Sequence, residues 1–259
     1  MRTMTAFFLL FALVPAPAQD KPPAADKAAE AVVKKAIDAH GGKDVLAKHT
    51  TVKFTLKGTL RVGTADNPFT GVVITSGAGK YRLEMEATLD RQKYSVTQVV
   101  NGSAVKSGRT LNGLPLSALS DAEREELVTA AAAQEATQLL PLLDAKRFTL
   151  KTAPDEAVGG KPAAGVMATL VESKKEVKLL FDRETGFLVK TSRKGLGPGE
   201  AGPVDVVQDA EMSGFKVFDG VKIATAVKVS NDGKPFMTLE VTAYARVDKP
   251  DPKLFDSDN

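Results

Sequence analysis

The sequence predicts a mainly β protein: a single-domain, incomplete antiparallel β-barrel (a half-barrel) of about eleven to twelve strands covered by a helical lid. Three observations predict it. From position 51 onward, apolar and polar residues alternate with period two, as in strands with one buried and one solvent-exposed face. Short turns rich in glycine, asparagine and aspartate separate these segments, which favours antiparallel pairing. One capped helical segment interrupts the strands, and so many strands with one apolar face are expected to curl.

Composition excludes several classes of function. The chain has 259 residues, 43% hydrophobic and 26% charged, with a net charge of +3. Basic residues are scattered through the strand-like segments instead of forming a stripe, which argues against a nucleic-acid partner. Cysteine is absent, which excludes disulfides, thiolate metal sites, iron–sulfur clusters, a cysteine nucleophile and a lipid-modified N-terminal cysteine.

The first 18 residues are typical of a signal peptide. Arg2 precedes nine apolar residues (6–14), and Ala16-Pro17-Ala18 fits the small-residue pattern of a cleavage site. Nine residues are too few to span a membrane, which needs about 20. We therefore expect an exported protein, periplasmic or secreted after cleavage near Ala18, that does not span the membrane. Residues 19–25 form a Pro- and Ala-rich linker, and 26–259 form the single domain.

A helix is predicted over 26–40. Asp26 is its N-cap, because its carboxylate can accept the free amides of the first turn. Apolar residues from Ala29 to Ile37 then follow at helical spacing. Gly41-Gly42 ends the helix, since glycine adopts the left-handed cap conformation without penalty. Residues 43–48 are typical of one more short turn.

Five strands are predicted in the next part of the chain. Asp66-Asn67-Pro68 predicts a turn between the first two, and Asn101-Gly102 is the strongest dipeptide signal for a tight hairpin. The predicted strands cover 51–62, 69–76, 80–87, 93–100 and 103–109.

A second helix is predicted over 121–140, in the middle of an otherwise β chain. Ser120 and Glu123 form a capping box at its start, and Pro141 stops it. Leu127 and Leu139 belong to its apolar face. This helix is expected to lie across the sheet as a cover.

Seven further strands complete the prediction. Asp182–Gly186 and Asn231–Gly233 are read as hairpin turns, and 195–203 as a longer Gly/Pro loop. The predicted strands cover 147–151, 163–172, 176–182, 187–193, 204–213, 221–230 and 236–247.

Short catalytic patterns occur without the context that their chemistry needs. Gly197–Gly202 fits G-x-G-x-x-G, but a dinucleotide site requires that motif to open a helix, and here it precedes a strand. Two S-x-x-K tetrapeptides and the terminal Ser257-Asp258-Asn259 lack the K-T-G of a β-lactamase. Chance explains these matches best.

Titratable residues do not assemble into a site either. His40 and His49 lack the spacing of zinc ligands and are read as helix-end and loop histidines. Glu84 and Glu86 share a strand face with Arg82, which is typical of a solvated charge ladder. The sequence therefore predicts no catalytic residue, no metal and no cofactor.

Large apolar residues supply the candidate site. They either form a solid core or line a cavity under the helical cover. A cavity would suit a lipid, because about 0.8 kcal/mol per buried methylene amounts to about 13 kcal/mol of gross transfer energy for a 16-carbon chain. The candidate ligand-binding residues are Phe54, Leu56, Tyr81, Leu83, Met85, Val96, Leu127, Leu139, Met167, Leu179, Phe181, Phe187 and Val189.

The order of helix, strands, helix and strands resembles the periplasmic lipoprotein-sorting carriers, the LolA/LolB-like proteins. Phe181–Lys190 is similar to the family's "fD-x-x-tG-l-l" hairpin, and Gly77–Leu83 to its "P-G-k-y-R" turn, although Ala78 replaces the proline. Similar closing segments are Asp219–Ile223, Asn231–Lys234 and Asp251–Phe255.

The resemblance implies an incomplete antiparallel barrel with a helical lid over a hydrophobic cavity. It also implies an arginine between lid and barrel, for which Arg124 and Arg147 are candidates. Where relatives often carry a tryptophan after the Asn101-Gly102 turn, this chain has Val105.

The expected function is that of an exported, non-enzymatic, monomeric binding protein. It would carry a lipid, a lipoprotein acyl chain or another lipophilic ligand, as in transport for outer membrane biogenesis. The alternative is a periplasmic sensor or interaction module that binds another envelope protein, and the third is an enzyme on the same fold. An apolar cavity favours the carrier, a filled core with an exposed apolar patch favours the module, and converging titratable groups favour the enzyme.

Overall fold

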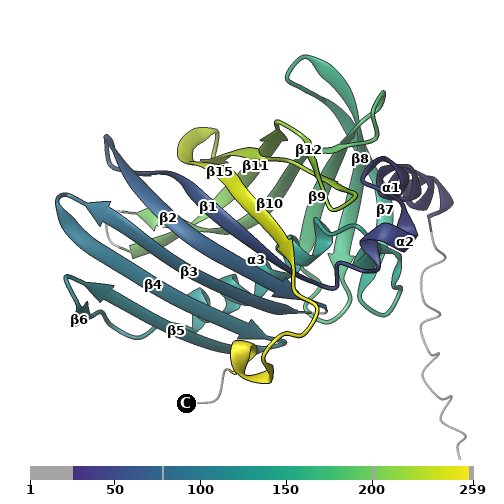
Figure 1. The fold of residues 1–259 in the computed structure, drawn as a ribbon. Coiled ribbons are helices and arrows are strands. Elements are labelled where there is room, and N and C mark those ends of the chain that lie inside the picture. The colour runs from purple at the N-terminus through teal and green to yellow at the C-terminus, as the bar shows by residue number, and fades with distance from the viewer. Residues whose placement is uncertain (1–25, 78, 200–201, 257–259) are drawn as a thin grey trace, which may run out of the picture.

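The computed structural model describes residues 26–77, 79–199 and 202–256, so the predicted signal peptide and linker (1–25) lie outside the described residues. Within them, thirteen strands form one antiparallel sheet that curves into an open half-barrel (Figure 1). The edge strands β6 (Leu114–Pro115) and β7 (Phe148–Val158) do not pair with each other in the described chain. The predicted fold class is confirmed. The sheet has thirteen strands, one more than the upper end of the predicted range of eleven to twelve.

The sheet has two halves built from successive hairpins. The N-terminal half contains β1 (Thr51–Val62), β2 (Ala65–Ser76), β3 (Lys80–Leu89), β4 (Gln92–Asn101), β5 (Ala104–Leu111) and β6. The C-terminal half contains β7, β8 (Lys161–Leu170), β9 (Glu176–Asp182), β10 (Leu188–Gly199), β11 (Gly202–Ser213), β14 (Ala226–Asn231) and β15 (Lys234–Arg246). The short strands β12 (Lys216–Phe218) and β13 (Val221–Ile223) form a separate ribbon.

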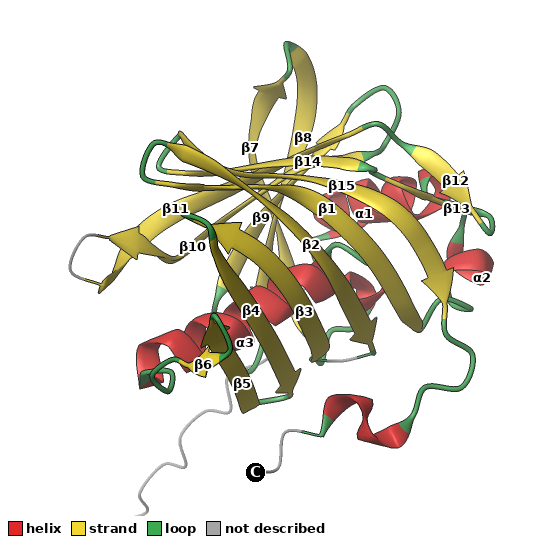
Figure 2. Ribbon diagram, turned by 60° about the vertical axis from the view of Figure 1, so that its left-hand side comes forward, coloured by secondary structure: helices red, strands yellow, loops and turns green. Residues whose placement is uncertain are grey.

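Three α-helices and two 3-10 turns complete the described chain. They are α1 (Lys27–Ala39), α2 (Lys43–Leu46), α3 (Asp121–Ala136), η1 (Leu140–Leu143) and η2 (Pro252–Phe255). α3 lies on the concave side of the sheet, and the strands arch over it (Figure 2). The predicted lid position of the central helix is confirmed.

Strand β1 joins the two halves, because it pairs with β2 on one side and with β15 on the other. Phe54 lies opposite Val73 on β2 and Tyr244 on β15, and Val73 lies opposite Leu83 on β3. Opposite residues of an antiparallel pair share a face of the sheet. These four side chains therefore follow one another across the concave face.

Helix α1 starts where the sequence predicts it. The Asp26 carboxylate accepts hydrogen bonds from the backbone amides of Ala28 (3.0 Å) and Ala29 (3.1 Å). Its other oxygen accepts from the amide of Thr152 on edge strand β7, at 2.7 Å. These bonds, the one from Thr152 foremost, lower the pKa of Asp26. One side chain thus caps the helix and covers an open amide of the sheet edge.

The main core fills the concave face over β7, β8 and β9. There α1, η1 and the C-terminal part of α3 pack against the inward side chains of these strands. The core comprises Ala29, Val33, Ala36, Ile37, Ala132, Ala136, Leu139, Leu142, Phe148, Val166, Ala168, Leu170, Val177, Leu179, Phe181 and Leu188.

The convex face carries charges and a small second core. Ile74 and Val99 are buried there under Phe255 of η2. Arg82 pairs with Glu84 (Nε to Oε1, 2.8 Å) on the same convex face, as the charge-ladder interpretation predicts. Carboxylates of β3 therefore lie away from the concave side.

The lid helix is shorter than predicted. The capping box of Ser120 and Glu123 is present, but α3 ends at Ala136 instead of residue 140. Leu139 has a left-handed backbone (φ +68°), and the chain continues as the 3-10 turn η1 with Pro141 near its start. Proline cannot continue a helix interior because it lacks an amide hydrogen, so the chain turns before it.

The predicted loop 195–203 is wrong. β10 and β11 extend through it as a hairpin in which Pro198 lies opposite Pro203. β10 pairs with β9 only as far as Arg193, so beyond that point each strand needs amide partners on one side only. Proline is tolerated in such a ribbon for that reason. The glycines of the 197–202 pattern belong to this ribbon.

Two other boundaries differ from the prediction. The predicted turn 66–68 lies within β2, and the turn precedes it, at Gly63 (φ +61°). The predicted strand 221–230 is two strands, β13 and β14, interrupted at Thr225. The Thr225 hydroxyl donates to the backbone oxygen of Gly214 (2.5 Å), which draws the chain away from a straight strand.

Truncation on the two faces of the sheet tests this register. Leu179 is fully buried in the core, whereas Met167 on β8 points to the opposite, convex face. We expect Leu179→Ala to lower the free energy of unfolding by about 2–5 kcal/mol, as for other buried leucines. Met167→Ala, measured by the same urea titration, should cost much less. Equal losses would contradict the assigned register.

Candidate ligand-binding site

A cavity of about 540 Å³ lies between the concave face of the sheet and the underside of α3. Its walls come from β1, β2, β3, β10, β11, β14 and β15, and its cover from α3 and the turn that follows (Figure 2). The apolar side chains of its walls include Val52, Phe54, Leu56, Phe69, Val73, Leu83, Met85, Met212, Val227, Val229, Met237, Leu239 and Val241.

Six of the predicted ligand-binding residues line this cavity. They come from β1, from β3 and from the end of the lid segment, which the fold brings to one space. They are Phe54, Leu56, Tyr81, Leu83, Met85 and Leu139.

The other predicted residues do not line it. Leu179 and Phe181 belong to the solid core, because α1 packs directly on their part of the concave face. Val96 is buried on the concave face of β4, and Leu127 is half-buried on α3. Phe187 and Val189 line a second hollow of about 490 Å³ at the start of β10.

Met167 is a wrong assignment of face. In β8 the inward side chains are Val166 and Ala168, which lie opposite Leu179 and Val177 of β9. Met167 lies opposite Lys178 and therefore faces the convex side. The segment around it is apolar on both faces, so alternation alone does not determine which face is buried.

The sequence interpretation missed the wall formed by β14 and β15. Val227 and Val229 on β14, and Leu239 and Val241 on β15, all line the cavity. Their period-two spacing was a usable signal. For β14 the break at Thr225 conceals where the strand begins, whereas β15 largely coincides with the predicted strand 236–247.

The underside of α3 is made of small and uncharged polar side chains. Ala130, Ala133, Gln134 and Thr137 follow at i, i+3, i+4 and i+7 and line the cavity. Alanine leaves space beneath the helix, and glutamine and threonine present hydrogen-bonding groups to it. The cavity is therefore mainly apolar on its sheet side, where Arg193 and Gln208 are exceptions, and its α3 side carries no charged residue.

Ion pairs fasten the N-terminal half of α3 to both sides of the opening. Glu123 pairs with Arg109 of β5 (2.9 Å), and Glu126 pairs with Arg193 of β10 (2.7 Å). The Glu126–Arg193 pair is well shielded, with 17% and 9% of the two side chains exposed. A side chain at Gly195 would come within 2.9 Å of Glu126, so glycine leaves room for this pair.

A second fastening holds the C-terminal half of α3. Glu135 is buried, and its carboxylate accepts from Arg147 at 2.6 Å and from the amide of Gly79 at 2.9 Å. Arg147 is thus one of the two arginines proposed between lid and barrel. The other, Arg124, donates to the backbone oxygen of Val105 (3.1 Å). Arg193, which no local pattern singles out, has an equivalent role.

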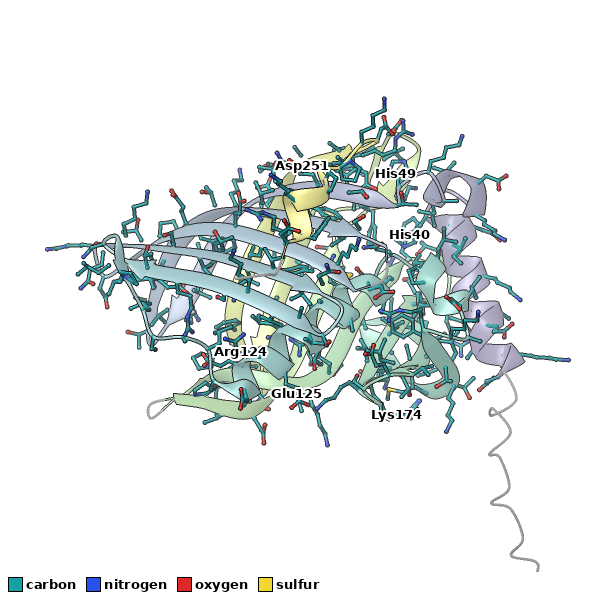
Figure 3. The ribbon with its side chains drawn as sticks, turned by 90° about the horizontal axis from the view of Figure 1, so that it is seen from below. His40, His49, Arg124, Glu125, Lys174 and Asp251 are labelled. Atoms are coloured by element: carbon teal, nitrogen blue, oxygen red, sulfur yellow. The ribbon has the colours of Figure 1, made fainter. Side chains whose placement is uncertain are left out.

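His40 stabilises the end of the cavity nearest α1 (Figure 3). Its Nδ1 lies 2.6 Å from the backbone oxygen of Lys222, and its Nε2 accepts from the amide of Leu188 at 3.2 Å. These partners require the neutral ring with hydrogen on Nδ1. Burial lowers the pKa of His40, because removal from water disfavours the charged ring. As predicted, it is a helix-end residue.

His49 lies at the same end of the molecule (Figure 3). Its Nδ1 is 2.9 Å from the Tyr244 hydroxyl, and its Nε2 is 3.7 Å from the carboxylate of Asp219. Burial raises the pKa of Tyr244. Tyr244 also packs edge-on against Phe54, with ring centroids 5.2 Å apart. The imidazole thus binds the tyrosine that forms part of the cavity wall.

Two features of the described residues concern metals and membranes. Nowhere in these ranges do three or more His, Asp or Glu side chains gather in a way that could hold a metal ion. No helix in them has the length and apolar character needed to cross a membrane.

Known structures show the same fold. A domain named as an outer membrane lipoprotein-sorting protein from Vibrio parahaemolyticus superposes with a TM-score of 0.53 at 9% identity, covering 89% of this chain and 97% of that one. A DUF1329 family protein from Desulfovibrio piger gives 0.52 at 10%, covering 88% and 97%. A LolA superfamily protein from Nitrosomonas europaea gives 0.50 at 11%, covering 88% and 97%.

These likenesses show a LolA-like fold, in agreement with the resemblance of the turns. No protein-family model and no curated protein matches the sequence.

Stability should depend on the charge of His40. The unfolded chain has an ordinary histidine pKa of about 6.5, and the folded pKa is lower. The contribution of His40 is therefore complete above pH 6.5 or so and is lost as pH falls through the folded pKa, at no more than about 1.4 kcal/mol per pH unit. Urea titrations between pH 7.5 and 5 should show a steeper loss for the wild type than for His40→Gln. Parallel curves would contradict this role.

The shielded ion pair of the lid should matter more than its exposed neighbour. Glu126→Gln leaves Arg193 without its carboxylate, at a cost of about 1–3 kcal/mol, and should speed amide hydrogen exchange along α3. Glu125→Gln is the matched control, because Glu125 pairs with Lys175 at the surface. If both variants exchange at the same rate, the Glu126–Arg193 pair does not hold the lid.

Proposed function

We propose that this protein is an exported, non-enzymatic carrier that holds the acyl chain of a lipid or acylated protein between its half-barrel and α3. One observation carries the proposal: the 540 Å³ space on the concave face has apolar walls and a separate helical cover. Its volume lies within the range of ligand sites, about 300–1,000 Å³. A chain of methylenes gains about 0.8 kcal/mol for each group removed from water, and such walls provide that gain.

The N-terminal half of α3, which adjoins the cavity-lining residues Ala130 and Ala133, can leave the sheet at low hydrophobic cost. The part of α3 from Asp121 to Val128 has no fully buried residue, and ion pairs attach it to the sheet. Ions of a pair regain hydration when they separate, which offsets much of the lost attraction. The part from Thr129 to Ala136 is packed into the core. The N-terminal half is therefore the half whose displacement costs least.

The chemistry of the cavity wall supports binding over catalysis. Among the described residues that line it, none is Asp or Glu. Arg193 is neutralised by Glu126, and both ring nitrogens of His40 have backbone partners. A hydroxyl–imidazole pair does occur among them, because the Tyr244 hydroxyl lies 2.9 Å from His49 Nδ1, and His49 Nε2 lies 3.7 Å from the Asp219 carboxylate. Burial raises the pKa of Tyr244, which disfavours the phenolate that covalent catalysis would need as its nucleophile.

Cellular location and oligomeric state are part of the same proposal. The N-terminal 18 residues fit a signal peptide, which supports export, and the superposed Vibrio domain is named for lipoprotein sorting. We propose a periplasmic monomer. The alternative of a module that binds an envelope protein predicts a filled interior, and the cavity favours the carrier.

Native mass spectrometry of the protein purified from its host's envelope tests the proposal. We expect a reproducible extra mass that solvent extraction releases as a lipid or lipopeptide. A bare protein mass, together with failure to bind added lipids, would overturn the carrier and leave the binding module.

A side chain that fills the cavity from the lid should block binding. Ala133 lines the cavity, so Ala133→Phe places a ring in the space that the ligand needs. Overfilling a site of fixed size costs about 1–3 kcal/mol, so we expect roughly tenfold weaker binding of a fluorescent alkyl probe. Ala122→Phe is the control, because Ala122 is exposed on the same helix. Equal affinity of both variants would place the ligand elsewhere.

A further inference from the structure

The three tyrosines of the chain have three different environments. The Tyr244 hydroxyl is bonded to His49 at 2.9 Å. Tyr94 lies on the concave face of β4, opposite Ala87, and does not line the cavity. Tyr81 lines the cavity, and its hydroxyl makes no hydrogen bond to any described residue. Tyr81 is therefore the tyrosine with a free polar group at the site.

The Tyr81 hydroxyl remains a hydrogen-bond donor at physiological pH. Burial raises its pKa to about 12, because the phenolate would be poorly solvated there. Tyr81 is half-buried, and its hydroxyl is not one of the fully buried polar atoms that lack a partner. A ligand oxygen that accepts from it in place of water contributes about 0.5–1.5 kcal/mol, as for a neutral hydrogen bond.

The register places Tyr81 beneath the lid. Tyr81 lies directly opposite Thr75 in the β2–β3 pair. The Thr75 hydroxyl oxygen accepts from Nε2 of Gln138, just beyond α3, at 2.8 Å. Gln134 is one helical turn earlier and lines the same cavity, and its side-chain amide has no hydrogen bond within the described chain. Tyr81 and Gln134 thus present neutral hydrogen-bonding groups to the lid side of the space.

We propose that Tyr81 donates a hydrogen bond to the carbonyl oxygen of an acyl ester or amide, with the acyl chain on the apolar wall of the sheet. This inference rests on the proposed carrier function and names the ligand class: acyl linkages with a carbonyl, in preference to hydrocarbon or ether lipids. The small underside residues Ala130 and Ala133 leave room for the linkage under α3. Gln134 offers a second neutral donor.

A matched pair of lipids tests this class. Monododecanoylglycerol carries an ester carbonyl, and dodecylglycerol ether differs from it only by lacking that oxygen. Affinities of the full mature chain for both are measured by displacement of a fluorescent alkyl probe. A neutral hydrogen bond predicts about three- to tenfold tighter binding of the ester.

Two tyrosine variants locate the effect. Tyr81→Phe keeps the ring and should abolish the preference by weakening ester binding alone, with ether binding unchanged. Tyr94→Phe removes a hydroxyl outside the cavity and should keep the preference.

The outcomes separate the inference from the function on which it rests. Equal affinity of the unmodified protein for ester and ether overturns the inference whether or not Tyr81→Phe folds, and so does a preference that survives Tyr81→Phe. In both cases probe binding shows that the carrier proposal still stands. Failure of the probe and both lipids to bind overturns the carrier proposal, and the inference with it.

Discussion

The need to cover one broad apolar face determines the rest of this structure. An open antiparallel sheet with alternating side chains exposes that face unless other elements pack on it. Over β7–β9, α1 and η1 fill the curve and form a solid core with Leu179 and Phe181. Over the remaining strands α3 and the turn after it are the main cover, and the alanines of α3 leave part of the curve unfilled. A core and a 540 Å³ cavity thus lie side by side on one continuous surface.

The two halves of α3 serve different purposes. Glu135 and the alanines around it are buried, and they tie the helix to the start of β7 and to the β2–β3 turn. Glu123 and Glu126 instead use ion pairs at the two sides of the opening. Apolar burial is lost in full when a contact breaks, whereas separated ions regain water. The same helix is therefore firmly packed at one end and attached by exchangeable contacts at the other.

The fold could be predicted from the sequence because its signals are local. Alternation around Phe54 and Tyr81, the Ser120 capping box and the Asn101-Gly102 turn each depend on a few neighbouring residues. Other features depend on distant partners. Leu179 and Leu83 look alike in sequence, and only the docking of α1 determines that one is in the core and the other at the cavity. The Glu126–Arg193 pair joins residues far apart in the chain, and neither has a local pattern that indicates it.

The distribution of polar groups bears on how the proposed carrier would discriminate between ligands, since no Asp or Glu is among the described residues that line the cavity. Charges in a low-dielectric space are costly unless they are paired, and Arg193 has its partner in the lid. The polar groups on the underside of α3 are amides and hydroxyls. The free-energy cost of leaving such a neutral group without a partner is smaller than that of leaving an ion without one. Apolar walls bind any hydrocarbon chain of suitable length with little distinction. In the proposed carrier, selectivity among such chains would depend on neutral donors such as Tyr81 and Gln134, which line the cavity near the meeting of α3 with β2 and β3.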